Sequence, residues 1–356
     1  MAGSLVCPLH TFAGSDSKPW KWSREAMFQT TTPRGIRCHI CPNECVLGEG
    51  DLSDCRNRKV YNGKLYTIAY GNPCVVHIDP MEKKPLYHFF PSSQIFSIAT
   101  AGCNMACLNC QNWTISQSSP TETRNYDLMP DKVVLKTIEN NCKSIAYTYS
   151  EPVTFYEYVY DTSYLARQAG IKNVIVSNGF INRAPLNKLS TVIDAANIDL
   201  KSMDDSVYLR LTAGKLQPVL DTLKTLKENG IWLEITNLVV PSWTDDSDMI
   251  KRMCNWLANN GFSNTPLHFS RFHPQYKLQR LPATPLQTLE NARKIALTEG
   301  LEYVYIGNVP GNDFSDTFCP ECSKLIISRS GFRIMDRQIE DGKCRYCGNE
   351  IPGVWN

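Results

Sequence analysis

The chain of 356 residues has no long apolar run and almost no net charge. No stretch reaches the ~18 apolar residues that a membrane-spanning helix needs, and residues 1–15 lack the apolar core of a signal peptide. The 37 Lys and Arg nearly balance the 35 Asp and Glu, so there is no basic excess typical of nucleic-acid binding. We therefore expect a cytoplasmic protein with no membrane span and no nucleic-acid partner.

Cysteine, in contrast, is abundant. Of fifteen cysteines, eleven fall into three short-spaced clusters, which in a reducing compartment indicates metal binding rather than disulfides. The other four are isolated, and we expect them to behave as small buried hydrophobic residues. These are Cys7, Cys74, Cys142 and Cys254.

The central cluster has the spacing C-x3-C-x2-C and consists of Cys103, Cys107 and Cys110. Three thiolates can hold three irons of a 4Fe-4S cluster and leave the fourth iron open to a non-protein ligand. The spacing alone is also compatible with part of a zinc site or with no metal. The triad follows the apolar run 95–99 in a loop with Gly and Asn, as expected at the C-terminal end of a barrel strand, which favours the iron-sulfur cluster.

The first cluster, Cys38, Cys41, Cys45 and Cys55, has the spacing C-x2-C-x3-C-x9-C. Four thiolates leave no open position, so they predict either a structural zinc site or a second iron-sulfur cluster. Of these two we favour zinc.

The last cluster consists of two C-x2-C knuckles separated by twenty-one residues. Its members are Cys319, Cys322, Cys344 and Cys347. This pattern, with β-prone segments between the knuckles, predicts a zinc ribbon that holds together a piece too small for its own core.

Between these clusters, short β-rich runs alternate with amphipathic segments of helical length. The predicted strands are 95–100, 144–149, 173–177, 195–200, 231–240 and 267–272, followed by 302–306. The predicted helices are 131–140, 153–168, 217–228, 247–258 and 285–298. This alternation predicts an α/β fold, a partial (β/α)6 TIM-like barrel.

The resulting domain scheme has four parts. Residues 1–35 form a loosely held arm, and 36–90 a four-cysteine N-terminal module. Residues 91–310 form the barrel, and 311–356 the zinc-ribbon-like module.

The chain resembles the radical S-adenosylmethionine (SAM) enzymes of the AmmeMemoRadiSam system, relatives of the activating enzymes of pyruvate formate-lyase. The resemblance rests on the triad with Gln111-Asn112-Trp113, on 38–55, on 78–80 and 83–88, and on 351–353. It implies that the open iron chelates the amino and carboxylate groups of SAM and delivers an electron. Cleavage then gives methionine and a 5′-deoxyadenosyl radical. It also implies a low-potential electron donor such as flavodoxin or ferredoxin.

The same resemblance implies which side chains bind SAM. Glu151 stands where the activating enzymes place the carboxylate for the SAM amino group, and Ser177 and Asn178 stand near the ribose or methionine moiety. Glu151 is also compatible with a first-turn helix position beside Pro152, and Asn178 with a plain strand-to-helix turn.

Two further candidates follow the fourth predicted strand. Alternation would send Asp199 and Lys201 to the same face, where they could pair and border the SAM site, or form a purely structural ion pair. His273 matches a histidine near the SAM carboxylate in the activating enzymes.

Some positions depart from the family pattern. Asn109 replaces an aromatic residue near the adenine, so that contact must come from elsewhere, with Trp113 as a candidate. Val176 replaces a cation-binding aspartate, and 236–237 replace an arginine that reaches SAM, so we expect polar anchoring there.

The leading hypothesis is a radical SAM enzyme that abstracts hydrogen from a small-molecule, lipid or protein substrate. One alternative is an activase of a glycyl radical enzyme, although no extra cysteines lie between Cys110 and Cys142 for the ferredoxin-like inserts that such activases commonly carry. The other is a catalytically inactive zinc-ribbon binding protein, which the intact triad and the balanced charge disfavour.

Overall fold

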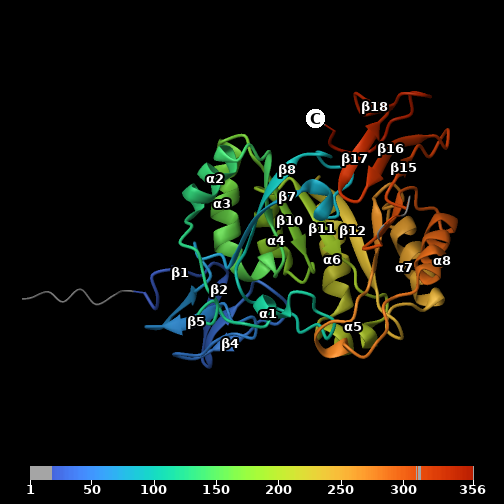
Figure 1. Cartoon of the computed structure of the whole chain (residues 1–356). Coiled ribbons are helices and arrows are strands. Elements are labelled where there is room, and N and C mark those ends of the chain that lie inside the picture. Colours follow the sequence, from blue (N-terminus) through green and yellow to red (C-terminus); the bar gives the residue numbers. More distant parts are fainter. Residues whose placement is uncertain (1–17, 310, 312–313, 356) are drawn as a thin grey trace, which may run out of the picture.

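The centre of the molecule is an eight-stranded, mostly parallel sheet (Figure 1). The computed structural model describes residues 18–309, 311 and 314–355. The strand order is β14-β13-β12-β11-β10-β9-β8-β7, with β7 antiparallel to β8 and every other pair parallel. The strands are β7 Val75–Pro80, β8 Gln94–Ala99, β9 Ser144–Tyr147, β10 Lys172–Ser177, β11 Ala195–Asp199, β12 Trp232–Val239, β13 Leu267–Arg271 and β14 Val304–Gly307.

Helices connect the parallel strands, and the amphipathic ones among them cover one side of the sheet, whereas α1 and α5 lie at its lower end in Figure 1. The helices are α1 Trp113–Ser116, α2 Pro130–Glu139, α3 Tyr156–Gln168, α4 Arg183–Ser190, α5 Asp205–Thr212, α6 Leu216–Glu228, α7 Ser247–Asn259 and α8 Leu286–Thr298. Short 3-10 helices are η1 Met81–Lys83, η2 Pro152–Phe155 and η3 Tyr276–Leu278. In α6, for example, the buried residues recur at Leu216, Val219, Leu220 and Leu223, the spacing of one helical face.

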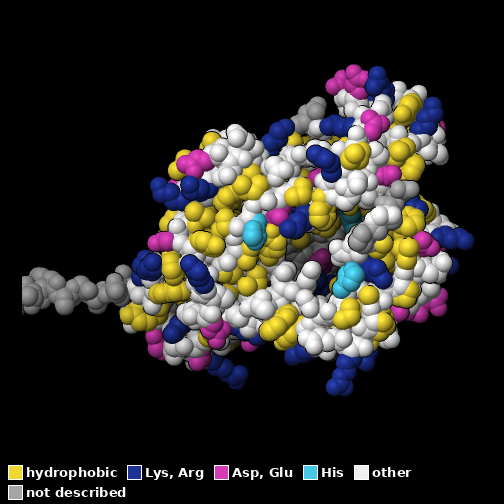
Figure 2. All heavy atoms as spheres, in the orientation of Figure 1, with side chains coloured by type: hydrophobic (Ala, Val, Ile, Leu, Met, Phe, Trp, Pro, Cys, Tyr) yellow, Lys and Arg dark blue, Asp and Glu magenta, His cyan; other side chains and the backbone are white. Residues whose placement is uncertain are grey.

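The sheet does not close into a barrel, since no hydrogen-bonded pairing joins β14 to β7 among the described residues. The surface is hollowed near the centre of the face in Figure 2, and acidic, basic and histidine side chains lie at the margin of the hollow. The alternating strands and helices expected from the sequence are present. The carboxyl ends of the parallel strands therefore share one edge, where ligand sites of such sheets form.

Two small antiparallel sheets precede the central sheet. Their strands are β1 Arg24–Glu25, β2 Gln29–Thr32, β3 Gly35–Cys38, β4 Val46–Leu47, β5 Arg58–Tyr61 and β6 Lys64–Thr67, in the orders β1-β6-β5 and β2-β3-β4. The structure differs here from the expected arm, because Arg24–Glu25 pair with β6 and Gln29–Thr32 pair with β3. The rest of that expectation, residues 1–17 including Cys7, lies outside the described residues.

The C-terminal residues form a second β-rich module. Its strands are β15 Thr317–Phe318, β16 Leu325–Ser330, β17 Arg333–Arg337, β18 Ile339–Glu340 and β19 Lys343–Cys344. A hydrophobic cluster joins the module to Tyr305 of β14 and to Tyr303 just before that strand, and Phe89 forms a β-bridge with Val354. The module thus packs on the body of the protein.

A chain of hydrogen bonds reinforces this contact. Arg329 donates to Thr317 (2.8 Å), whose hydroxyl lies 2.9 Å from that of Tyr305. The Tyr305 hydroxyl lies 2.6 Å from Nε2 of His88, and His88 Nδ1 lies 2.7 Å from the Pro352 carbonyl. Because a carbonyl can only accept, Nδ1 carries the proton of a neutral ring and Nε2 accepts from Tyr305. Burial lowers the pKa of His88 to about 4, which keeps this ring neutral.

Two other expectations concern membrane-spanning helices and the burial of the isolated cysteines. Among the described helices none is long and apolar enough to cross a membrane. Cys142 and Cys254 are buried, whereas Cys74 is half-buried.

Candidate active site at the carboxyl edge of the sheet

The loop that carries Cys103, Cys107 and Cys110 follows β8 and is held from two sides by its backbone. Ala106 and Leu108 N–H groups donate to carbonyls at the end of α5, Thr212 and Leu211, both at 2.9 Å. On the other side, Lys277 of η3 donates to the Leu108 carbonyl at 3.0 Å. The loop is therefore fixed before any ligand binds.

Hydrogen-bonding groups lie close to two of the three sulfur atoms of the triad. The Met105 N–H lies 3.4 Å from Cys103 Sγ, and the amide of Asn178 lies 3.8 Å from the same sulfur. The buried hydroxyl of Ser116 lies 3.1 Å from Cys110 Sγ. Such donors suit thiolates, which only accept.

The protonation state of these thiols depends on what they bind. Burial raises the pKa of Cys107 to about 11, although Lys201 works against this, and burial also raises the pKa of Cys103. Because metal ligation requires thiolates, it would displace these protons. The donor set fits the three-cysteine ligation of an iron-sulfur cluster.

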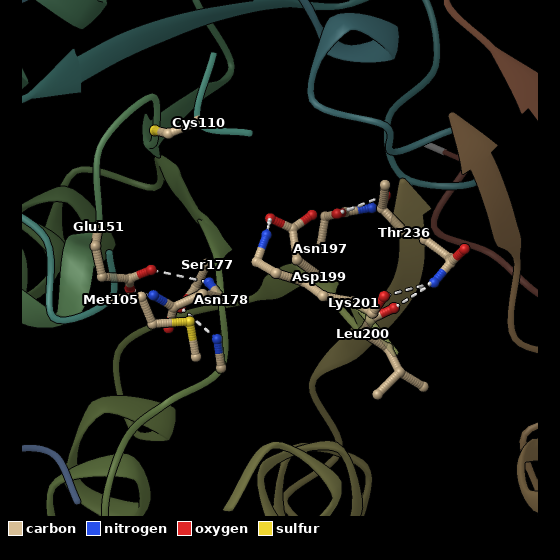
Figure 3. A network of polar contacts seen from close by, with 12 residues as sticks. Met105, Cys110, Glu151, Ser177, Asn178, Asn197, Asp199, Leu200, Lys201 and Thr236 are labelled. Carbon is tan, nitrogen blue, oxygen red and sulfur yellow. Dashed lines mark hydrogen bonds and ion pairs between the residues drawn. The ribbon is translucent and has the colours of Figure 1, made fainter. Parts of the chain in front are cut away.

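Glu151 is buried beside this loop and reaches the next strand (Figure 3). Its carboxylate accepts hydrogen bonds from Ser177 Oγ at 2.7 Å, from Asn178 N at 2.8 Å and from Val153 N at 3.1 Å. Burial raises the pKa of Glu151 to about 7, although the hydrogen bonds work against this. Glu151 also caps η2 with Pro152 at its first position, so the alternative helix-start interpretation holds at the same time.

Asn178 links the carboxylate to the cysteine loop. Its side-chain amide donates to Asn104 Oδ1 at 2.9 Å, and its own oxygen accepts from Phe180 N at 2.9 Å. Three of the predicted side chains, Glu151, Ser177 and Asn178, thus meet beside Cys103, on the left of Figure 3.

Asp199 ends the neighbouring strand β11, and Lys201 two residues later forms with it the ion pair that alternation predicts, at 2.9 Å. Burial would lower the pKa of Lys201, but Asp199 and then Cys107 raise it overall, so the amine stays charged. Both side chains remain partly exposed. The pair borders the Cys107 side of the triad.

No hydrogen bond or ion pair among the described residues joins His273 to this group. Its ring is exposed after β13, with Nε2 3.4 Å from the Asn308 carbonyl. Thr236 donates to Asn197 at 2.9 Å, and Asn237 donates to the Leu200 carbonyl at 2.7 Å. These two side chains therefore connect β12 to β11 and to the residue that follows Asp199.

Trp113, the candidate for the missing aromatic contact, is 39% exposed and stacks on Tyr276, with ring centroids 5.2 Å apart. Asn112 beside it donates to the Tyr149 carbonyl at 2.7 Å and so ties the cysteine loop to the loop of Glu151. Neither Asn112 nor Asn104 was given a role from the sequence. The available signal was an asparagine directly after Cys103 and another two residues after Cys110.

A second group of side chains was also missed. Asp79 on β7 accepts from Lys84 at 2.7 Å and from Lys83 at 2.8 Å, and the Tyr149 hydroxyl also donates to it. Burial alone would raise the pKa of Asp79, but these donors hold it well below its usual range. The sequence motif 78–88 contains all but Tyr149, whose side chain reaches Asp79 from the loop after β9.

The C-terminal cysteines form a compact group. Their four sulfur atoms lie within 4.8 Å of one another, with 3.6 Å between Cys319 and Cys347 and 3.8 Å between Cys322 and Cys344. Zinc–sulfur bonds of about 2.3 Å give tetrahedral edges of about 3.8 Å. The spacing therefore fits a single tetrahedral ion.

The structure is thus that of an α/β protein with a cysteine triad at the carboxyl edge of a mostly parallel sheet. The Radical SAM superfamily matches residues 97–255. Uncharacterized protein MJ0808 of Methanocaldococcus jannaschii is 47% identical over 334 residues, 93% of this chain and 99% of that protein. Pyruvate formate-lyase 1-activating enzyme of Escherichia coli K12 is 26% identical over 208 residues, 54% of this chain and 85% of that enzyme.

Among solved structures, a domain of pyruvate-formate lyase-activating enzyme from Bacteroides vulgatus is 18% identical with a TM-score of 0.41, covering 46% of this chain and 99% of that domain. The chain belongs to the radical SAM superfamily and is an enzyme of that superfamily. Membership implies a 4Fe-4S cluster and SAM.

Proposed function

We propose that this enzyme cleaves SAM reductively at a cluster held by Cys103, Cys107 and Cys110, and abstracts hydrogen from a substrate. One observation carries the proposal. The carboxylate of Glu151, the amide of Asn178 and the sulfur of Cys103 meet at the edge where the parallel strands end. A carboxylate that can bind the amino group of SAM thus lies beside the proposed ligands of the cluster.

Each residue has a defined part in this proposal. When bound, the cluster supplies one electron to SAM, which yields methionine and the 5′-deoxyadenosyl radical. In its ionised form, the Glu151 carboxylate accepts a hydrogen bond from the ammonium group of SAM. Ser177 and Asn178 orient this Glu151 carboxylate. Asp199 and Lys201 border the site as an ion pair, and the exposed ring of His273 is the proposed partner of the SAM carboxylate.

The finer assignments are proposals as well. We assign the chain to the AmmeMemoRadiSam-type enzymes, with a partial barrel at 91–310 and metal modules at 36–90 and 311–356. Zinc is the proposed ion of the C-terminal module, supported by the sulfur spacing. A cytoplasmic flavodoxin or ferredoxin is the proposed class of electron donor.

A second candidate is the activation of a glycyl radical enzyme. It is favoured by the 26% identity to the Escherichia coli activating enzyme over 54% of this chain. An activase would transfer the radical to a glycine of a protein partner. The first candidate function does not specify the class of substrate. Formation of an oxygen-sensitive glycyl radical in a partner protein would separate the two.

The test is anaerobic incubation of the reconstituted protein with SAM and dithionite. We expect 5′-deoxyadenosine to form slowly without substrate, and to disappear in Cys107→Ala. The matched control is Cys142→Ala, an isolated buried cysteine. Formation of methylthioadenosine instead would replace hydrogen abstraction with aminocarboxypropyl transfer, and no cleavage by protein with a full, reducible cluster would contradict the proposal.

A further inference from the structure

The four N-terminal cysteines converge on one cavity. Cys38 and Cys55 are buried and Cys41 and Cys45 half-buried, and all four line a cavity of about 20 Å³. Cys38 ends β3, whereas the other three lie in the loops around β4. The fold thus gathers four thiols from a stretch of eighteen residues at one place.

The spacing of these thiols differs from that of the C-terminal module. Within the described part of the chain, only the C-terminal cysteines form a group of three or more possible ligands with all ligand atoms within 4.8 Å. Four sulfur atoms about 2.3 Å from a common ion lie about 3.8 Å apart. No three of the N-terminal thiols lie as close together as the C-terminal ones, and the ligands of a multi-iron cluster are also more widely spaced.

A buried arginine nitrogen without a hydrogen-bond partner points to an anionic occupant of this cavity. Arg58 lines the cavity and is 1% exposed, and its Nη1 bonds both carboxylate oxygens of Glu157 at 2.7 Å. Its Nη2 is buried and has no hydrogen-bond partner among the described residues. A buried donor without a partner is costly, and the sulfur atoms of a cluster would satisfy it.

The cavity adjoins the loop of the radical SAM triad. Asn104, next to Cys103, lines the cavity, and its carbonyl accepts from Asn43 at 3.0 Å. Asn57 donates to the Ala101 carbonyl at 2.8 Å. The two cysteine sites therefore share a packed interface with no intervening element.

We propose that Cys38, Cys41, Cys45 and Cys55 hold a second iron-sulfur cluster that passes electrons to the cluster of the triad. This replaces zinc as the preferred occupant. In the transfer the second cluster is oxidised by one electron and the first is reduced by one, and no atom moves. An external one-electron donor, dithionite in the test, reduces the second cluster again, and the partial exposure of Cys41 and Cys45 gives it access.

The test uses the full chain with Cys103→Ala, Cys107→Ala and Cys110→Ala combined, which leaves the N-terminal thiols intact. After anaerobic reconstitution we expect iron and acid-labile sulfide in a ratio of about one, and a paramagnetic signal after reduction with dithionite. Adding Cys38→Ala should remove both, whereas adding Cys254→Ala, a matched isolated buried cysteine, should remove neither. Zinc without sulfide in the triple variant would overturn the proposal.

The wild-type protein decides the matter even if the triple variant does not fold. More than about four sulfides per chain requires a second cluster, because the triad holds one 4Fe-4S cluster. At most four sulfides together with two zinc ions per chain would contradict the proposal and leave the SAM-cleaving function intact. For electron transfer, Cys38→Ser should slow reduction of the triad's cluster at least tenfold in stopped-flow absorbance, and an unchanged rate would contradict it.

Discussion

Replacing Gly102 with alanine tests how tightly the N-terminal module packs on the cysteine loop. Gly102 has φ +99°, and an added Cβ would lie 2.5 Å from Asn57 Oδ1 and 2.5 Å from the Cys55 carbonyl oxygen. Asn57 is fully buried and the carbonyl belongs to the backbone, so neither can move cheaply. The change combines backbone strain with a steric clash.

The expected loss of stability is the sum of the backbone strain and the steric clash. A left-handed conformation costs a non-glycine residue about 1–3 kcal/mol, and overpacking costs about 1–3 kcal/mol more. We therefore expect Gly102→Ala to lower the free energy of unfolding by about 2–6 kcal/mol. Gly50 is the matched control, since it has φ +83° and no atom within 4 Å of an added Cβ, so Gly50→Ala should cost only the strain term.

The assay is urea-induced unfolding of wild type and both variants, followed by circular dichroism, together with their iron content after reconstitution. Gly102→Ala should unfold at lower urea than Gly50→Ala and bind less iron. Equal destabilisation of the two variants, with equal iron, would refute the close packing of the cysteine loop on the N-terminal module.

Three further predictions concern other sites. Glu151→Ala should weaken SAM binding about 10- to 150-fold in equilibrium dialysis, because a charge-assisted contact contributes roughly 1.5–3 kcal/mol, and unchanged affinity would exclude Glu151 from the site. Because burial lowers the pKa of His88 to about 4, the unfolded chain binds more protons between pH 4 and 6.5. Stability should then fall by about 1.4 kcal/mol per unit as pH drops through this window, and His88→Gln should lose that part of the slope in urea titrations. Cys322→Ser should lose one zinc ion and expose the C-terminal module to proteolysis while iron stays unchanged, and wild-type zinc content would contradict a metal site there.

Much of the central sheet could be predicted because buried parallel strands and amphipathic helices have distinct periodicities. The apolar runs at β8 to β14 and the long helices α2, α3, α6, α7 and α8 match their predicted ranges closely. The helices α4 and α5 were missed, since eight residues give too few turns for a periodic pattern. The strand Gln29–Thr32 was missed because its four residues are all polar, so the sequence shows no alternation of apolar and polar residues.

The candidate site was predictable only where local sequence determines it. Alternation along one strand is sufficient to place Asp199 and Lys201 on one face. The bonds from Glu151 to Ser177 and Asn178 depend on the pairing of separate strands, and the exposed ring of His273 depends on a loop path. The bond from Tyr149 to Asp79 likewise joins residues seventy positions apart.

The most direct test of the central claim is electron paramagnetic resonance of the reduced protein with and without SAM. If the triad leaves one iron open, adding SAM should change the signal of its cluster in wild type and in Cys322→Ser. Cys110→Ala should show no such change. A triad-dependent signal that SAM leaves unaltered in wild-type protein would contradict an open iron at this site.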